Sequence, residues 1–275
     1  MGWKRLDQRL VEEGLVASRE RARSLILAGR VQVDGRRVDK AGRLIAPAAV
    51  VEIRGLEHPF VGRGGVKLQA ALSIFGISVK DKVCLDVGAG TGGFTDCLLQ
   101  AGAARVFAVD VGHGRFHQRL RDDPRVVLME RVNVRHLIPG LLPEPPDLVV
   151  IDVSFISLTL VFPVIVNFLP PQGEIIALIK PQFEVGKGEV GKGGVVRDPR
   201  KHGAAIRRVT GTASELDMMV RGLCVSPIAG AKGNREFFIH LARGEGPPQV
   251  AGGVERLIEE VIEPIRDSSV AEKAR

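Results

Sequence analysis

The chain has 275 residues with a formal net charge of +7, and 45% of them are hydrophobic, which suffices for one large domain and a second small one. Its three cysteines, Cys84, Cys97 and Cys224, contain no CxxC pair, which argues against a disulfide framework or a metal site and fits a reducing compartment. The N-terminal residues carry no apolar signal region, so we expect a cytoplasmic protein.

Positive charge is concentrated near the N-terminus. Residues 1–45 contain eleven Lys and Arg against six Asp and Glu, an excess of five positive charges. A basic module in front of a nearly neutral body indicates a polyanionic partner, and we expect nucleic acid. The alternative is an ordinary solvated surface. The side chains that we predict to bind RNA in this module are Arg5, Arg19, Arg23, Arg30 and Arg36.

The same region has the pattern of a small α+β domain. Residues 4–13 predict a short amphipathic helix, and a second helix is predicted from the N-cap Ser18 to Gly29. An Asp-Gly hairpin turn follows, and residues 49–53 predict a further strand. This order resembles the small RNA-binding domain first known from ribosomal protein S-four, over residues 1–55.

Residues 61–72, VGRGGVKLQAAL, place three glycines just before an apolar run. A nucleotide-binding loop would have a lysine directly after glycine and then a hydroxyl residue, whereas Lys67 stands between valine and leucine. We therefore expect residues 56–65 to be a linker with a glycine hinge, followed by a helix from Lys67 to Phe75. The hinge would deliver Lys67 to the next domain.

From residue 83 onward the chain alternates apolar strands with helices. This rhythm is typical of a Rossmann-like α/β fold, an open and mostly parallel sheet with helices on both faces. Ligands of such sheets bind beyond the carboxyl ends of the strands. The predicted strands are KVCLDVG, RVFAVD, RVVLME, DLVVIDV, GEIIALIK, MMVRGLCVS and REFFIHLA, and helices are predicted over residues 93–100, 115–121, 200–215 and 254–262.

Residues 148–170 are long and apolar enough to imitate a membrane span. However, Asp152 lies within the segment, Pro163 interrupts it, and several polar side chains dilute it. A buried strand followed by a core-facing helix explains the segment better, so we expect no stable membrane association.

A glycine-rich loop, LDVGAGTGGF, ends the first strand of the sheet domain and satisfies the dinucleotide pattern GxGxxG. Asp86 would repel a pyrophosphate but could pair with an ammonium group. We therefore favour S-adenosylmethionine over NAD, and the loop resembles the first motif of class I methyltransferases. Asp110 could accept two ribose hydroxyls, and Asn133 could lie near the adenine unless it only satisfies its own turn. The predicted cofactor-binding residues are Asp86, Gly88, Gly90, Gly92, Gly93, Phe94, Asp110 and Asn133.

Four ionisable residues are predicted at the same sheet edge. Asp152 and Lys180 end the fourth and fifth strands, Glu236 opens the last one, and Lys67 begins the helix before the domain. Buried ionisable groups are costly unless they are paired, so a structural ion-pair cluster is one explanation.

Catalysis is the other explanation. A lysine whose pKa is lowered by burial and by a second ammonium group can remove the proton of a ribose hydroxyl. We predict that Lys180 is this base and that Lys67 stabilises the nascent alkoxide. Asp152 would orient Lys180, and Glu236 would hold the network together.

These residues match the Lys-Asp-Lys-Glu tetrad of FtsJ-like ribose 2′-O-methyltransferases. The motifs DVSFISLT, LIKPQFE, GKGGVVRD and GNREFF are similar to those of the haemolysin A (TlyA-type) family, which joins an S-four domain to such a methyltransferase. The resemblance covers nearly the whole chain and implies S-adenosylmethionine-dependent 2′-O-methylation of ribosomal RNA, with cytidine as the target. It implies a methyltransferase domain over residues 66–245 and a C-terminal helix and tail over residues 246–275. Familiar members have Ser-Arg-Gly where this chain has Gly-Arg-Gly at residues 62–64, a departure in the linker.

Residues 181–198 form a long glycine-rich segment directly after Lys180. Loops of this length are usually functional or disordered. We predict that Lys187 and Lys192 in this loop, with Arg63 in the linker, bind RNA phosphates, and that loop closure shields methyl transfer. A flexible loop without function is the alternative.

The sequence thus predicts an RNA ribose 2′-O-methyltransferase that acts on ribosomal RNA or ribosomal subunits. One alternative is an RNA-binding ribosome-assembly factor whose methyltransferase domain is inactive, although the intact tetrad argues against it. Another is a membrane-active haemolysin, a property associated with the family, but the sequence contains no obvious pore-forming segment.

Overall fold

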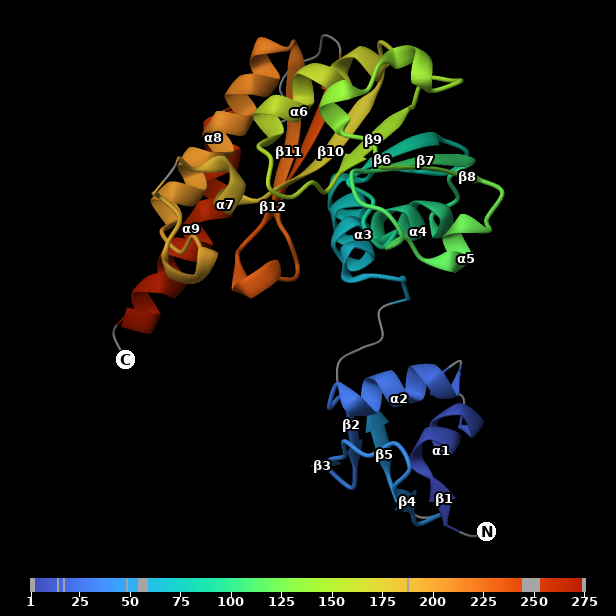
Figure 1. Ribbon diagram of the computed structural model, residues 1–275. Helices are drawn as coiled ribbons and strands as arrows, with labels where there is room; N and C mark the ends of the chain where they lie inside the picture. Colours follow the sequence, from blue (N-terminus) through green and yellow to red (C-terminus); the bar gives the residue numbers. More distant parts are fainter. Residues whose placement is uncertain are drawn as a thin grey trace. The chain divides into compact units, whose positions relative to one another are not determined.

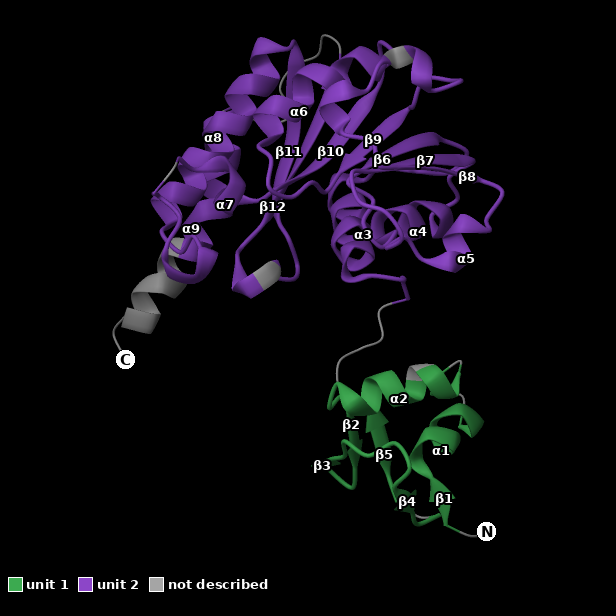
Figure 2. Ribbon diagram, in the orientation of Figure 1, with its two compact units in different colours: residues 1–57 green, residues 58–275 purple. Residues whose placement is uncertain are grey.

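The computed structural model describes residues 3–13, 15–16, 18–47, 49–53, 59–186, 188–243 and 253–273. The chain divides into two compact units, residues 1–57 and residues 58–275 (Figure 2). Each unit has its own hydrophobic core, and we describe them separately.

The first unit combines two short helices with two small antiparallel sheets. The predicted hairpin at Asp34–Gly35 is confirmed, and the φ angles of these residues, 51° and 75°, are both positive, as a type I′ turn requires. Leu6, Leu10 and Ile26 are fully buried between the helices and strands. The elements are β1 (Lys4–Arg5), α1 (Leu6–Glu12), α2 (Arg19–Leu27), β2 (Val31–Val33), β3 (Arg36–Arg37), β4 (Leu44–Ile45) and β5 (Val51–Ile53).

The second unit is built on a seven-stranded sheet with the order β11-β12-β10-β9-β6-β7-β8. The strands are β6 (Val83–Val87), β7 (Arg105–Asp110), β8 (Val126–Glu130), β9 (Leu148–Ile151), β10 (Glu174–Ile179), β11 (Met218–Val225) and β12 (Phe237–Arg243). Strands β6 to β10 are parallel, and β12 is antiparallel to both of its neighbours. The predicted, mostly parallel α/β sheet is confirmed. The direction in which strands are added reverses between β6 and β9, and such a switch point leaves a crevice at the carboxyl ends.

Helices cover both faces of this sheet (Figure 1). One face carries α3 (Arg63–Phe75), α4 (Gly93–Gln100) and α5 (Gln118–Arg121), whose core includes Leu68, Leu98 and Leu120. The other face carries α6 (Leu158–Ile165), α8 (Pro199–Glu215) and α9 (Gly253–Lys273), with α7 (Pro181–Glu184) beside α8. Short 3₁₀ turns are η1 (Val134–His136), η2 (Pro139–Leu141), η3 (Val166–Phe168), η4 (Lys192–Gly194) and η5 (Ala231–Gly233).

Several elements begin or end differently from the predictions. Helix α1 begins at Leu6, because Lys4 and Arg5 form β1, and α9 continues to Lys273, beyond the predicted end at residue 262. Helix α3 begins at Arg63 rather than Lys67, so the last residues of the predicted linker form its first turn. Phe60 is buried under this turn, and a side chain at Gly65 would come within 2.2 Å of its ring, so glycine is needed there. After Lys180 the chain forms α7 rather than a loop, because Pro181 favours the first helical position.

The segment that imitated a membrane span is part of the sheet domain. Strand β9 is wholly buried, and α6 follows it with Leu158, Val161, Phe162 and Ile165 in the core. The predicted buried strand and core-facing helix are therefore confirmed. Within the described parts of the chain, no helix is both long enough and apolar enough to cross a membrane.

Candidate active site

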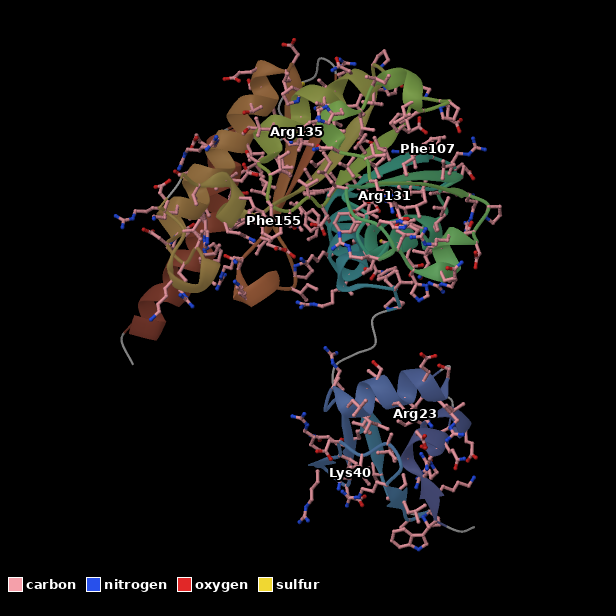
Figure 3. The ribbon with its side chains drawn as sticks, in the orientation of Figure 1. Arg23, Lys40, Phe107, Arg131, Arg135 and Phe155 are labelled. Atoms are coloured by element: carbon pink, nitrogen blue, oxygen red, sulfur yellow. The ribbon has the colours of Figure 1, made fainter. Side chains whose placement is uncertain are left out.

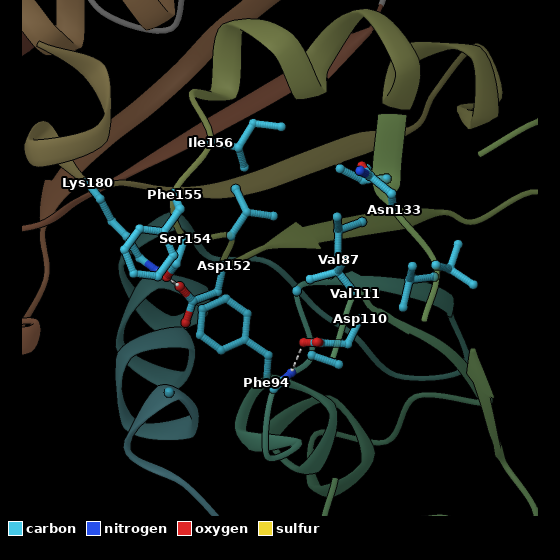
Figure 4. Close-up of a pocket in the computed structure, with 18 of the residues that line it drawn as sticks. Val87, Phe94, Asp110, Val111, Asn133, Asp152, Ser154, Phe155, Ile156 and Lys180 are labelled. Carbon is cyan, nitrogen blue, oxygen red and sulfur yellow. Dashed lines mark hydrogen bonds and ion pairs between the residues drawn. The ribbon is translucent and has the colours of Figure 1, made fainter. Parts of the chain in front are cut away.

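A cavity of about 740 Å³ opens at the carboxyl ends of β6, β7, β9 and β10 (Figure 4). Its volume lies in the range of small-molecule sites, and it occupies the crevice at the switch between β6 and β9. Of the predicted site residues, those that line it are Gly88, Gly90, Gly93, Phe94, Asp110, Asn133, Asp152 and Lys180.

The glycine-rich loop after β6 forms one wall of the cavity, and its conformation requires glycine. Gly88 has a φ of +87°, and a Cβ atom there would lie 2.6 Å from the carbonyl oxygen of Asp152. Gly92 has a φ of +94°, and a Cβ atom there would lie 2.4 Å from Leu120. Gly92 faces this packed side and does not line the cavity. At Gly88 and Gly90 the loop therefore brings its backbone to the ligand space.

A second contact of this loop involves the start of α3. A Cβ atom on Gly93 would lie 3.1 Å from the backbone nitrogen of Gly65 and 3.3 Å from the Cα atom of Gly64. The first turns of α3 and α4 thus meet backbone to backbone, and Gly64 lines the cavity itself.

Asp110 presents a fixed carboxylate at the cavity wall. Its Oδ2 atom accepts a hydrogen bond from the backbone of Gly90 at 2.7 Å, and Oδ1 accepts one from Gly112 at 2.6 Å. Arg115 approaches Oδ1 at 3.2 Å. A carboxylate oxygen can accept more than one hydrogen bond, so these contacts leave acceptor capacity for ligand hydroxyls.

Asn133 lines the cavity next to η1. Its side chain accepts a hydrogen bond from the backbone nitrogen of Arg135 at 3.0 Å and so caps η1. It therefore satisfies its own turn, as the alternative explanation held, and it also faces the ligand space.

Asp86 lies beneath the glycine-rich loop and does not line the cavity. It is fully buried, and its Oδ2 atom accepts a hydrogen bond from the Thr95 hydroxyl at 2.6 Å. Its Oδ1 atom has no hydrogen-bond partner among the described residues. Burial raises the pKa of the Asp86 carboxyl to about 7. The structure therefore does not bring this carboxylate to the ligand surface.

Lys180 and Asp152 form an ion pair in the cavity wall. Their side chains meet at 2.6 Å, and the Lys180 ammonium also donates to the Ser154 hydroxyl at 2.9 Å. Strands β9 and β10 are parallel neighbours, so the residues that follow them lie at the same sheet edge. Figure 4 shows both side chains pointing toward the cavity.

Lys67 and Glu236 form a second ion pair, which is buried and does not line the cavity. The Lys67 ammonium donates to Glu236 at 2.5 Å. Gly64 lies one turn before Lys67 on the same face of α3, and a Cβ atom there would lie 3.9 Å from Asp152 Oδ2. One face of α3 thus carries Lys67 and borders Asp152. The four residues predicted as a tetrad therefore form two ion pairs, Lys180 with Asp152 and Lys67 with Glu236.

Phe155 is a feature of the site that the sequence analysis missed. Its side chain is 91% exposed although it lines the cavity, and its φ of 64° is unusual for a bulky residue. Its ring centroid lies 5.1 Å from that of Phe183, and Figure 4 shows Phe155 and Lys180 among the residues that line the same cavity. The signal was available in the sequence, because Phe155 lies three positions after Asp152, between the predicted strand and its helix and at the edge of the sheet.

The loop that carries Phe155 is held by Glu184 of α7. The buried Glu184 carboxylate accepts hydrogen bonds from the backbone nitrogen of Leu158 at 2.9 Å and from the Ser157 hydroxyl. Burial raises the pKa of the Glu184 carboxyl. These bonds tie α7, which directly follows Lys180, to the start of α6. The loop after β9 and the segment after β10 are therefore fixed to each other.

The predicted RNA-binding residues of the second unit have different environments. Arg63 donates to the carbonyl oxygen of Ala229 at 2.8 Å, and Lys192 is exposed. Lys187 lies outside the described residues. The segment after Lys192 is anchored by Asn234, which accepts a hydrogen bond from the Val196 backbone at 3.0 Å.

In the first unit, Arg30 and Arg36 are exposed. The other three predicted RNA-binding residues, Arg5, Arg19 and Arg23, all contact the buried side chain of Asp7.

Comparison with known proteins gives two matches to sequence families: residues 60–243 match the FtsJ-like methyltransferase family, and residues 4–51 match the S4 domain. The Bacillus subtilis protein YqxC, described as a candidate rRNA methyltransferase, is 46% identical over 88% of this chain and 87% of its own length. The 16S/23S rRNA (cytidine-2′-O)-methyltransferase TlyA of Mycobacterium tuberculosis is 43% identical over 94% of this chain and 97% of its own. A solved structure from Streptococcus thermophilus, described as a candidate hemolysin, covers 100% of both chains with a TM-score of 0.76 and 38% identity.

Proposed function

The chain belongs to the FtsJ-like methyltransferase family, and from this premise we propose that it methylates a ribose 2′-hydroxyl of ribosomal RNA. It is an S-adenosylmethionine-dependent enzyme with an S4 domain in front of its methyltransferase domain. S-adenosylmethionine, when bound, supplies an electrophilic methyl group.

The cavity at the switch point fits this cofactor. Asp110 would accept hydrogen bonds from the ribose hydroxyls, because its carboxylate is held at the wall by two backbone N–H groups. The backbone of Gly88 and Gly90 would contact the ligand where no side chain intervenes. Asn133 would lie near the adenine. Asp86 would support the loop from beneath through its hydrogen bond to Thr95.

For catalysis, we assign the general base to Lys180. As an uncharged amine, it would accept the proton of the ribose 2′-hydroxyl, and the 2′-oxygen would take the methyl group. Asp152 would orient Lys180, because the two side chains already meet at 2.6 Å in the cavity wall. The ion pair of Lys67 and Glu236 would hold α3 against the site, with Lys67 adding positive charge near the developing alkoxide.

Phe155 supports a nucleotide substrate. An aromatic ring that is almost completely exposed beside the base offers a stacking surface for a nucleobase that has left its helix. We propose cytidine as this base, because the M. tuberculosis relative that is 43% identical is described as a cytidine enzyme. The basic N-terminal unit would bind the surrounding RNA.

The observation that carries this proposal is the ion pair of Lys180 and Asp152 in the wall of the cofactor cavity. The test is methyl transfer from labelled S-adenosylmethionine to undermethylated ribosomal subunits, with the wild-type chain and Lys180→Ala compared. We expect label in 2′-O-methylcytidine with the wild type and none with the variant. Label on a base would contradict the ribose assignment, and label on the ribose of another nucleotide would contradict the choice of cytidine. Tight cofactor binding without any transfer would favour the assembly-factor alternative.

A further inference from the structure

Three arginines in the first unit converge on one carboxylate. Arg5 donates to Asp7 through two nitrogens, at 3.0 Å and 3.1 Å. Arg19 donates to Asp7 Oδ2 at 3.1 Å, and Arg23 lies 3.3 Å from the same oxygen. The arginines come from separate parts of the unit, since Arg5 ends β1 and the other two lie four residues apart on α2. Figure 3 shows Arg23 on this helix.

The carboxylate is hidden while the arginines face solvent. The Asp7 side chain is 0% exposed, whereas those of Arg5, Arg19 and Arg23 are 41%, 48% and 55% exposed. The guanidinium groups hold the pKa of the Asp7 carboxyl well below its usual range, with Arg5 contributing most. One negative and three positive charges leave the cluster with an excess of two positive charges on an accessible surface.

Stability alone does not account for this arrangement. The buried Asp7 carboxylate needs a cationic partner, but the two hydrogen bonds from Arg5 already supply one, and a single carboxylate cannot neutralise three arginines. Each guanidinium has five N–H groups in a planar fork, more than its bonds to Asp7 use. The partly exposed guanidinium groups therefore keep N–H donors that can bind phosphate oxygens.

We propose that Asp7 is a positioning residue for RNA binding, which holds Arg5, Arg19 and Arg23 as a preformed phosphate-binding group. This inference rests on the proposed function, because it takes RNA as the partner. Without the carboxylate the three cations repel one another and separate, and binding must then immobilise three long side chains. The carboxylate thus strengthens the binding of a polyanion although it carries the same sign of charge.

Net charge and positioning predict opposite effects of removing the Asp7 charge on RNA affinity, and this difference provides the test. Asp7→Asn and Glu12→Gln each remove one negative charge from the same unit, and Glu12 forms a single exposed ion pair with Lys4. By net charge alone, both variants should bind RNA more tightly than the wild type. If Asp7 positions the arginines, only Glu12→Gln binds RNA more tightly than the wild type. Asp7→Asn then binds RNA about tenfold more weakly than the wild type, and its affinity depends less on salt.

The experiment measures fluorescence anisotropy of a fluorescein-labelled RNA hairpin with full-length variants, at several salt concentrations. Circular dichroism melting checks that the first unit is folded at the measuring temperature. A second variant, Arg19→Lys, keeps the charge but loses the fork, and we expect it to bind about threefold more weakly. It answers the question even where Asp7→Asn does not fold.

Weaker binding by folded Asp7→Asn, or by Arg19→Lys alone where Asp7→Asn is unfolded, supports the inference. Binding by folded Asp7→Asn that equals or exceeds the wild type overturns it. Wild-type affinity of Arg19→Lys overturns it where Asp7→Asn is unfolded. A wild-type chain that binds neither the hairpin nor ribosomal subunits would overturn the proposed RNA function itself, and the inference with it.

Discussion

The Lys180 ammonium lies 2.6 Å from the carboxylate of Asp152, across the ends of two neighbouring parallel strands. The contact is a direct result of the topology, because β9 and β10 both point their carboxyl ends at the cofactor cavity. In the function that we propose, this cation lies where a ribose hydroxyl meets the methyl donor.

Asp152→Asn should lower the rate of methyl transfer at least about 100-fold, because Lys180 loses its orienting charge. Asp147→Asn is a matched control at the other end of the same strand, where Asp147 accepts a hydrogen bond from the Val83 backbone at 2.9 Å. We expect the control to retain activity within about threefold. Single-turnover kinetics at saturating cofactor measure both. Equal losses in the two variants would mean that Asp152 has only a structural role.

Lys67→Met should destabilise the second unit by about 3 kcal/mol, because it leaves Glu236 charged and buried without its partner. In the double variant Lys67→Met/Glu236→Gln no charge is stranded, and we expect most of this stability to return. If the pair also serves catalysis, methyl transfer stays low in the double variant. Urea denaturation and the transfer assay measure the two properties. Recovery of both would leave the pair with a purely structural role.

Asp86 should make the stability of the second unit depend on pH. Burial raises its pKa to about 7, whereas an aspartate in an unfolded chain titrates near 3.9. Between these values the folded state keeps a proton that the unfolded state has released, so the free energy of unfolding falls as pH rises. Asp86→Asn cannot ionise. Its stability relative to the wild type should therefore increase by up to about 1.4 kcal/mol per unit from roughly pH 4 to pH 7.

Denaturation curves of both proteins across this pH range measure the effect. The comparison with the wild type removes the contributions of other titrating groups, which the two proteins share. A stability difference that stays constant from pH 4 to pH 7 would show that Asp86 is ionised throughout.

Phe155→Ala should weaken the use of RNA without unfolding the protein. Loss of a stacking surface for one base corresponds to about 1–3 kcal/mol, or roughly a 5-fold to 150-fold fall in kcat/KM for RNA. Ile74→Ala is a control that removes a side chain 60% exposed on α3. The cofactor Kd, measured by calorimetry, should remain unchanged in both variants. A fall in cofactor affinity as large as the fall in kcat/KM would place Phe155 in the cofactor site instead.

The sheet could be predicted from the sequence because its central strands are continuously apolar, as Leu148–Ile151 illustrates. The start of α3 could not be predicted from the sequence. Three of the four residues 62–65 are glycine, which disfavours a helix, and only the packing of Phe60 and the close approach of α4 compensate. Such tertiary contacts leave no trace in local propensity.

The positions of the site residues were also predictable only in part. Residues that end parallel strands share an edge, so the position of Asp152 and Lys180 followed from the order of elements. The separate pairing of Lys67 with Glu236 did not follow, because it depends on side-chain packing between α3 and the residue that precedes β12. Asp7 was missed as well, since one acid within a basic segment carries no sequence signal of the arginines that surround it.

The backbone contact between the first turns of α3 and α4 affects how this chain can be divided. A Cβ atom on Gly93 would lie 3.1 Å from Gly65 N and 3.3 Å from Gly64 Cα, and Gly64 lines the cavity, so the start of α3 forms part of the cavity wall. A chimera in which residues 1–65 came from another protein would replace Gly64, and with it that part of the cavity wall. A junction before Pro59 keeps this wall whole, because Pro59 and Val61 already bond to α4 through Gln100 and Asp96.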